Sequence, residues 1–142
     1  MRVRKLIQLR RKLRARFREQ VVLKPSEIAA TSKDEAFLKR VLEEVEEHIG
    51  DESFGVEMLA RKVGMSTSQI NRKLKALVNQ AANQFIRSLR LQRAADLLQQ
   101  DAGNIAEIAY QVGFSSQAHF STAFQKQFGC SPREFKRGEC GE

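Results

Sequence analysis

The sequence predicts an all-α protein in which two helix-turn-helix subdomains are joined by a long linker helix and preceded by a basic N-terminal helix. Three observations lead to this fold class. Apolar residues recur at three- and four-residue spacing, and nothing between the expected helices alternates with the period of a strand. Helix-capping signals are frequent, and one pattern occurs twice, about fifty residues apart.

The first 33 residues predict a basic helix followed by a linker. The stretch VLKPSEIAATSK, residues 22–33, has a proline and small polar residues without a sustained period, which is typical of a linker. The helix before it carries a narrow apolar seam, formed by Val3, Leu6, Leu9, Leu13 and Phe17. We therefore assign residues 1–33 to a connector.

Further helices are expected near residues 34–49, 55–63, 66–78, 82–99, 104–112, 115–128 and 132–137. Three of them begin with a capping box, in which two side chains satisfy free amides of the first turn. The pairs are Ser66 with Gln69, Asn104 with Glu107, and Ser131 with Glu134. Gly50 closes the first of these helices, and Pro132 takes the favoured first position of the last.

The internal repeat is visible when the chain is compared with itself. A shift of 49 residues lays VEMLARKVGMS (56–66) on IAEIAYQVGFS (105–115). With one added residue the match continues, because Ile70, Leu74 and Phe85 fall on Phe120, Phe124 and Phe135. Two similar helix–turn–helix units joined by a long helix follow from this pattern.

The shared V-G-apolar-S core predicts the geometry of each turn. Gly64 and Gly113 supply the positive φ that a sharp corner needs, and the next residue returns to the core. The following serine caps the second helix. A turn of this kind, whose second helix projects from the protein surface, is the DNA-binding helix-turn-helix. A plain structural hairpin is the alternative for one copy, and the second copy argues against it.

The charge distribution also points to nucleic acid. The net charge of +8 comes from residues 1–20, which hold nine Lys or Arg and one Glu. Residues 58–95 contain eight basic residues and no acid, whereas acids gather between Asp34 and Glu57. Such a local basic field on a neutral body is what phosphate contact requires. An ordinary solvated helix surface is the alternative reading of the charge alone.

The outer faces of the two second helices differ in chemistry. In the first, Ser68, Asn71, Arg72 and Lys75 lie opposite a buried stripe of Ile70, Leu74 and Leu77. Arg72 suits a bidentate contact to guanine, Asn71 suits adenine, and Lys75 suits phosphate. In the second helix, Ala118, Ser121, Thr122 and Gln125 lie opposite a stripe of Phe120, Phe124 and Phe128. This nearly uncharged face should discriminate between DNA sequences less strongly than the first helix does.

These motifs resemble the AraC/XylS-type transcription regulators over about residues 35–137, and residues 34–138 are assigned to that domain, with a tail at 139–142. The repeat at 109–120 and the closing F-G-x-S-P-x-x-F are the most specific motifs. The resemblance implies seven helices and two recognition helices in successive major grooves. It places base readers at Ser68, Asn71 and Arg72, and among Gln117, Ala118, Ser121 and Thr122. Phosphate contacts are expected from Ser66, Thr67, Lys75, Arg87, Ser115, Ser116 and His119.

Several positions depart from the family pattern. Thr122 stands where an arginine is frequent, which weakens the expected second-site base contact. The segment NQAAN, residues 79–83, replaces a common G-x-S-P, although Asn79 can adopt the left-handed conformation. Gly55 stands where a serine cap is usual. Along the linker helix, Arg87, Arg90 and Arg93 are expected on the surface, facing phosphate or an acidic helix.

Enzymatic activity is not expected, because no nucleophile–base pair, metal cluster or phosphate-cradling loop is present. No cofactor or metal is implied. Cys130 and Cys140 lie ten residues apart without a CxxC motif or nearby histidine and are expected to be reduced thiols. No apolar run approaches a membrane span, so a cytoplasmic domain without membrane contact is expected.

The expected function is that of a sequence-specific DNA-binding transcription regulator. The upstream domains of the protein and its protein partners stay open. The basic connector resembles the segment that leaves a receiver domain in response regulators or hybrid two-component sensors. Its seam could pair two chains, as could an upstream domain, or it could be a loose basic arm on DNA. The full-length protein could be membrane-anchored if it is a hybrid sensor, and contact with RNA polymerase is also open. A sequence-indifferent architectural DNA binder and a protein-interaction module are the alternative functions.

Overall fold

The computed structural model describes residues 32–140, and the predicted N-terminal helix and linker up to residue 31 lie outside them. Within that range the chain is helical and contains no strand. The helices are α2 (Ser32–Glu47), α3 (Val56–Val63), α4 (Thr67–Val78), α5 (Ala82–Gln99), α6 (Ile105–Gln111), α7 (Gln117–Phe128) and α8 (Pro132–Arg137). The fold class and the helix order are confirmed, and no helix end is displaced by more than two residues. None of these helices is long and apolar enough to cross a membrane.

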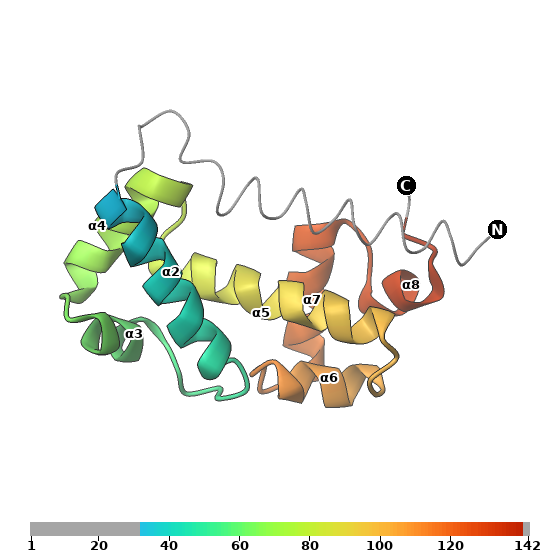
Figure 1. Cartoon of the computed structure of the whole chain (residues 1–142). Coiled ribbons are helices and arrows are strands. Elements are labelled where there is room, and N and C mark those ends of the chain that lie inside the picture. The colour runs from blue at the N-terminus through green and yellow to red at the C-terminus, as the bar shows by residue number, and fades with distance from the viewer. Residues whose placement is uncertain (1–31, 141–142) are drawn as a thin grey trace.

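The long helix α5 runs through the middle of the molecule and joins two groups of helices (Figure 1). Helices α2, α3 and α4 lie around its first half, and α6, α7 and α8 lie around its second half. Each group has its own hydrophobic core. The first contains Phe37, Val41, Leu59, Ile70, Leu74 and Phe85, and the second contains Leu91, Leu98, Ile108, Phe120, Phe124 and Phe135. The molecule is therefore two small packed units that share one helix.

The predicted repeat is present down to its backbone hydrogen bonds. In the first turn, Met65 N–H donates to the carbonyl of Ala60 at 2.9 Å. The matching amide of Phe114 donates to Ala109 at the same distance. Gly64 and Gly113 have φ values of 73° and 90°, so both corners use the left-handed region that only glycine enters without strain.

The added residue of the repeat lies just before α7. Ser66 caps α4 with its Oγ on the amide of Gln69, as predicted. In the second unit the cap is Ser116, which accepts from the amide of His119, and not Ser115. The expectation that α7 begins at residue 115 is therefore wrong by two residues, because Ser115 is an extra residue of the turn.

The repeat also extends through the turn that follows each second helix. Asn79 has a φ of 57° and donates to the carbonyl of Lys75, and Gly129 has a φ of 81° and donates to Gln125. Asn79 thus takes the left-handed conformation without a glycine, as the sequence allowed. Capping boxes at Asn104 and Ser131 are also confirmed.

The two cysteines form a disulfide, which corrects the expectation of reduced thiols. Gly129 reverses the chain after α7, and α8 then returns it, so the Cα atoms of Cys130 and Cys140 lie 5.4 Å apart. Both residues are buried against the second core. Reduced thiols were expected from the redox compartment, whereas the pairing depends on this reversal of the chain. The packed unit consequently extends to Cys140, into the segment assigned to the tail.

The two corner glycines have different surroundings. A Cβ atom on Gly64 would meet nothing within 4 Å. One on Gly113 would overlap the guanidinium of Arg90 and would lie 2.6 Å from the carbonyl oxygen of Ile49. Gly113 is therefore required both by its backbone conformation and by the space that Arg90 occupies.

Alanine substitution should separate these two requirements. Gly64→Ala should lower the free energy of unfolding by about 1–2 kcal/mol, the cost of a left-handed alanine. Gly113→Ala should lower it by about 3–5 kcal/mol, because the added methyl displaces a buried charge from its partners. Urea denaturation of the two variants measures both values. Equal losses would show that Arg90 moves aside without cost.

Candidate DNA interface

Helix α4 presents the predicted polar face. Its apolar stripe of Ile70, Leu74 and Leu77 is buried, and Ser68, Arg72 and Lys75 are exposed. Thr67 and Ser66 are also exposed, at the N-terminus of the helix. A serine hydroxyl that accepts an amide can still donate its own hydrogen, so the Ser66 cap remains able to bind a phosphate oxygen.

Asn71 has a structural role that the sequence did not reveal. Its side-chain Oδ1 accepts a hydrogen bond of 2.8 Å from the amide of Ala82, the first residue of α5. The amide of Ala81 is satisfied by Gln84, at 3.2 Å. Asn71 therefore supplies from α4 the cap that the NQAAN segment lacks. A bidentate contact of Asn71 with adenine uses both polar atoms of the amide, so its oxygen would be shared between the base and the Ala82 amide.

Helix α7 presents a smaller and less charged face. Phe120 and Phe124 are buried, and Phe128 packs partly buried against the same core. On the other side, Gln117, Ala118, Thr122 and Gln125 are exposed and Ser121 is half-buried. The face carries no charge before Lys126, in the last turn.

Three of the predicted phosphate-binding residues meet at one groove between the two units. Arg87, Ser115 and His119 line a groove of about 260 Å³, together with the start of α3 and the turn at Gly113. All three side chains are exposed. The His119 ring lies edge-on to Phe114, with ring centroids 5.9 Å apart, and this contact orients the imidazole near the N-terminus of α7. The tertiary fold thus brings together Arg87 of α5, His119 of α7 and Ser115 before it, in a groove that Glu52 also lines.

A second basic groove lies at the other side of the α7 N-terminus. Gln117 shares it with Arg133 and Arg137 of α8 and with Lys136, and its volume is about 420 Å³. Lys136 is held by Asp101, at 3.1 Å, and by the carbonyl of Gly103. These cations were not predicted to contact DNA, although PREFKR carries three of them in six residues.

Some basic residues of the stretch 58–95 are exposed on the surface, whereas others are buried or pack against α2. Lys73 lies 3.9 Å from Asp34 and 4.9 Å from the centroid of the Phe37 ring, so it faces α2. Arg93 pairs with Glu46 of α2 at 3.5 Å, as an acidic-helix partner was expected to do. Arg90 is buried with an exposure of 7%, which makes its predicted surface position wrong. The exposed cations that remain are Arg61, Lys62, Arg72, Lys75 and Arg87.

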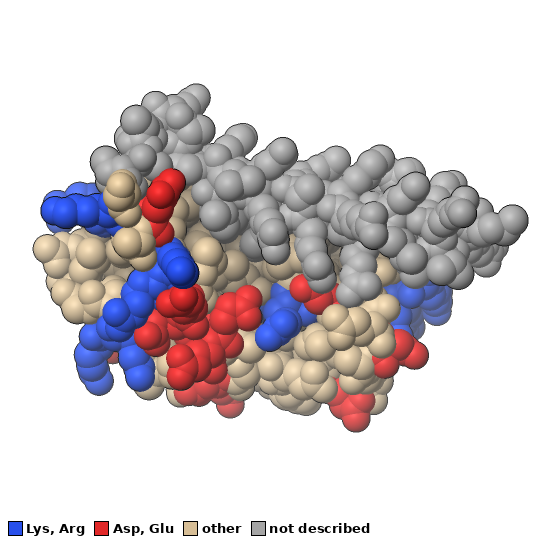
Figure 2. All heavy atoms as spheres, in the orientation of Figure 1, with Lys and Arg blue, Asp and Glu red and all other residues tan. Residues whose placement is uncertain are grey.

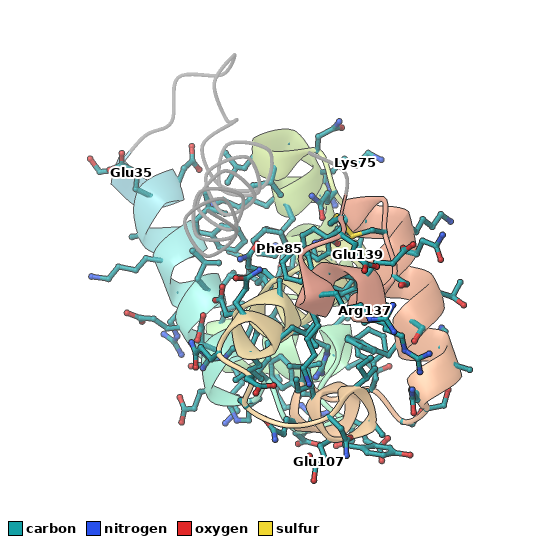
Figure 3. The ribbon with its side chains drawn as sticks, turned by 90° about the vertical axis from the view of Figure 1, so that its right-hand side faces the viewer. Glu35, Lys75, Phe85, Glu107, Arg137 and Glu139 are labelled. Atoms are coloured by element: carbon teal, nitrogen blue, oxygen red, sulfur yellow. A yellow bond between two sulfur atoms is a disulfide. The ribbon has the colours of Figure 1, made fainter. Side chains whose placement is uncertain are left out.

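The acidic side chains are concentrated on one helix. Acidic side chains gather over α2 on the face shown in Figure 2. In the perpendicular view of Figure 3, α2 and α7 lie on opposite sides, and Lys75 of α4 projects on the side of α7. The two second helices are thus turned away from the acidic helix.

The match to known families agrees with this geometry. A family described as a helix-turn-helix domain matches residues 59–138, which begin in α3 and end just after α8. The AraC-type DNA-binding domain of a transcriptional regulator from Chromobacterium violaceum superposes with a TM-score of 0.70 at 30% identity, over 78% of this chain and 98% of that one. The chain belongs to the AraC-type helix-turn-helix family. It is a DNA-binding domain of the type that transcription regulators carry.

Other relatives of this AraC-type domain are a response regulator, a histidine kinase and a transcriptional activator. The C-terminal domain of AraT, a response regulator from Geobacillus stearothermophilus, superposes with a TM-score of 0.66 at 27% identity, over 77% of this chain and 87% of that one. Histidine kinase P4 of Formosa agariphila is 38% identical over 136 residues, and the transcriptional activator RhaS of Escherichia coli is 33% identical over 104. These matches cover 96% and 73% of this chain, but only 10% of the kinase and 37% of RhaS.

Asn71→Ala should lower the free energy of unfolding by about 1 kcal/mol, because it removes the cap of α5. Asn71→Asp keeps the acceptor oxygen and should retain most of that stability. Thermal and urea unfolding of the two variants measure the difference. A stable alanine variant would contradict the capping role of this side chain.

Proposed function

We propose that this AraC-type domain recognises a bipartite DNA site sequence-specifically, with α4 and α7 in successive major grooves. The observation that carries the proposal is the repeated turn, which twice holds a helix with a buried apolar stripe and an exposed polar face. An architectural binder needs neither the repeated presentation nor two chemically different faces. Helix α5, with 18 residues, spans about 27 Å, which suits two readers about one DNA turn apart.

Helix α4 is the sharper of the two readers in this proposal. Arg72 donates two hydrogen bonds to a guanine, and Ser68 contacts a neighbouring base edge. Asn71 reaches a base with its side-chain nitrogen while its oxygen stays on Ala82. Lys75, Ser66 and Thr67 hold the phosphates that flank this groove.

Helix α7 reads by smaller contacts and depends more on its flanking cations. Gln117, Ala118, Ser121 and Thr122 offer polar atoms and methyl groups that suit thymine, water-mediated contacts and DNA shape. Phosphates on one side are held by Arg87, Ser115 and His119 at the groove between the two units, and by Ser116 at the N-terminus of α7. On the other side, Arg133 and Arg137 hold the backbone beside Gln117.

The acidic surface of α2 supports the same orientation of the domain on DNA. Phosphate charges repel the acids of α2 and attract the exposed cations of α4 and α5. Because α2 lies opposite α7, this field favours the approach in which the two reading helices face the duplex (Figure 3).

We also propose that the domain is the output module of a two-component signalling protein. The kinase match spans 136 of 142 residues, so it includes part of the segment before α2, which a match to the DNA-binding domain alone would leave out. The structural likeness to a response-regulator domain agrees with this placement. Residues 1–33 then connect the domain to an upstream signalling region, and pairing of two chains through residues 1–20 or through that region would bring two domains to one operator.

Selection of the 142-residue chain against a random duplex pool at two salt concentrations tests the DNA proposal. The expected result is a bipartite motif with centres about 10 base pairs apart and with a more sharply defined first half. A flat pool with a steep salt dependence would instead indicate an architectural binder. Absence of any DNA binding would favour an interaction module that uses the basic N-terminal segment.

Two substitutions on α4 separate base reading from phosphate contact. Arg72→Ala should cost about 1–3 kcal/mol of binding on the selected site and little on random DNA, whereas Lys75→Ala should weaken both alike. Fluorescence anisotropy titrations on both duplexes provide the measurement. If both variants lose the same affinity on the two duplexes, the assigned roles are incorrect.

A further inference from the structure

Arg90 lies at the boundary between the two units. Leu89 packs against the first core and Leu91 belongs to the second, so the arginine occupies the position on α5 where one core ends and the other begins. It is the charged residue that is buried among residues 32–140. A buried guanidinium costs several kcal/mol unless its donors are satisfied, so its partners matter.

The guanidinium donates to four backbone carbonyls from both units. Nη2 donates to Asp51 at 3.0 Å and to Phe54 at 2.9 Å. Nη1 donates to Ile49 and also, at 2.9 Å, to Val112. Ile49, Asp51 and Phe54 belong to the loop between α2 and α3, whereas Val112 ends α6 in the second turn. One side chain of the linker helix therefore joins a loop of the first unit to the turn of the second.

The loop that receives Arg90 is itself ordered. The carboxylate of Asp51 accepts the Oγ hydrogen of Ser53 at 2.6 Å and its amide hydrogen at 2.9 Å, and these bonds lower the pKa of Asp51. His48 stacks on Phe54 with ring centroids 4.7 Å apart. Burial lowers the pKa of Arg90, but an arginine remains charged at physiological pH. The guanidinium thus meets carbonyls held in place on both sides.

Two other side-chain contacts across the boundary between the units are both weaker than the Arg90 hydrogen bonds. The Arg93–Glu46 pair is exposed, and such pairs contribute little. Gln127 donates to the carbonyl of Ser88 at 3.3 Å, a long hydrogen bond. The absence of a side chain at Gly113 leaves the space that the guanidinium fills.

We propose that Arg90 fixes the angle between the two helix-turn-helix units and thereby determines which spacing of the two half-sites the domain accepts. The proposal rests on the DNA-reading function proposed above. Each added base pair rotates the second groove by about 34–36° and moves it by about 3.4 Å. A rigid joint rejects such a change. Without the Arg90 hydrogen bonds, the units keep α5 and the packing of Gly50 beside the carbonyl of Gln111, and they can adjust to it. Arg90 is a positioning residue, because it acts on DNA only through α4 and α7.

The test compares binding across spacer lengths. The wild-type chain and Arg90→Met are titrated by fluorescence anisotropy against the selected duplex, against duplexes with one or two base pairs added or removed between the half-sites, and against duplexes with one half-site scrambled. Arg93→Met is the matched control, because it also removes one arginine charge from α5, but from the exposed ion pair with Glu46. Circular dichroism and urea unfolding give the folded fraction, by which each affinity is corrected.

The expected wild-type profile falls about tenfold or more for each one-base-pair change. Arg90→Met should lose about tenfold at the best spacing, flatten the profile to about threefold or less, and bind the single half-site duplexes within about twofold of wild type. Arg93→Met should keep the wild-type profile. If Arg90→Met does not fold, Arg90→Lys is used instead, because it keeps the charge but a compact ammonium cannot span four carbonyls.

Two outcomes would overturn the proposal. A uniform loss on all duplexes with an unchanged spacing profile would mean that Arg90 only stabilises the fold. A flattened profile in Arg93→Met as well would mean that the angle depends on the whole of α5 and not on this joint. Failure of the wild-type chain to select any bipartite site would instead overturn the proposed function, so the two failures are distinguishable.

Discussion

The relation between the two halves of this domain depends on one buried guanidinium. Each half has its own apolar core, and apolar burial, although strong, is non-directional and leaves the angle between two small cores weakly determined. Hydrogen bonds from Arg90 to four carbonyls are directional and are shared by a loop of one half and a turn of the other. Gly113 accommodates this side chain while it forms the corner of the second unit, so the turn and the joint are one structural feature.

The duplicated unit has been adapted differently in its two copies. Both copies keep the corner glycine, the backbone hydrogen bonds of the turn and the buried stripe of the second helix. In the first copy the outer face carries Arg72 and Lys75, whereas in the second the cations lie on neighbouring helices, at Arg87, Arg133 and Arg137. Positive charge is thus available in both halves of the domain, and in the first half it lies on the exposed face of α4 itself.

The helices and the repeat could be predicted because their signals are local. Capping boxes at Ser66, Asn104 and Ser131 depend on residues three apart, and the corner glycines depend on a single backbone conformation. Contacts between residues far apart in the sequence could not be predicted in the same way. Arg90 has the same sequence signature as its neighbours Arg87 and Arg93, yet it alone points into the joint. Asn71 carries the residue type of an adenine reader, yet its oxygen caps a helix eleven residues further along the chain.

The sequence by itself determined the all-α class, the seven helices, the two turns and the chemistry of each exposed face, because periodicity and capping act within one or two helical turns. Only the tertiary structure decided which cations remain on the surface, which serine caps α7, and that Cys130 and Cys140 meet. It also gathered Arg87, Ser115 and His119 at one groove. The reason is geometric: these outcomes depend on how one helix or loop is oriented toward another, and residues of the same type are indistinguishable until that orientation is set.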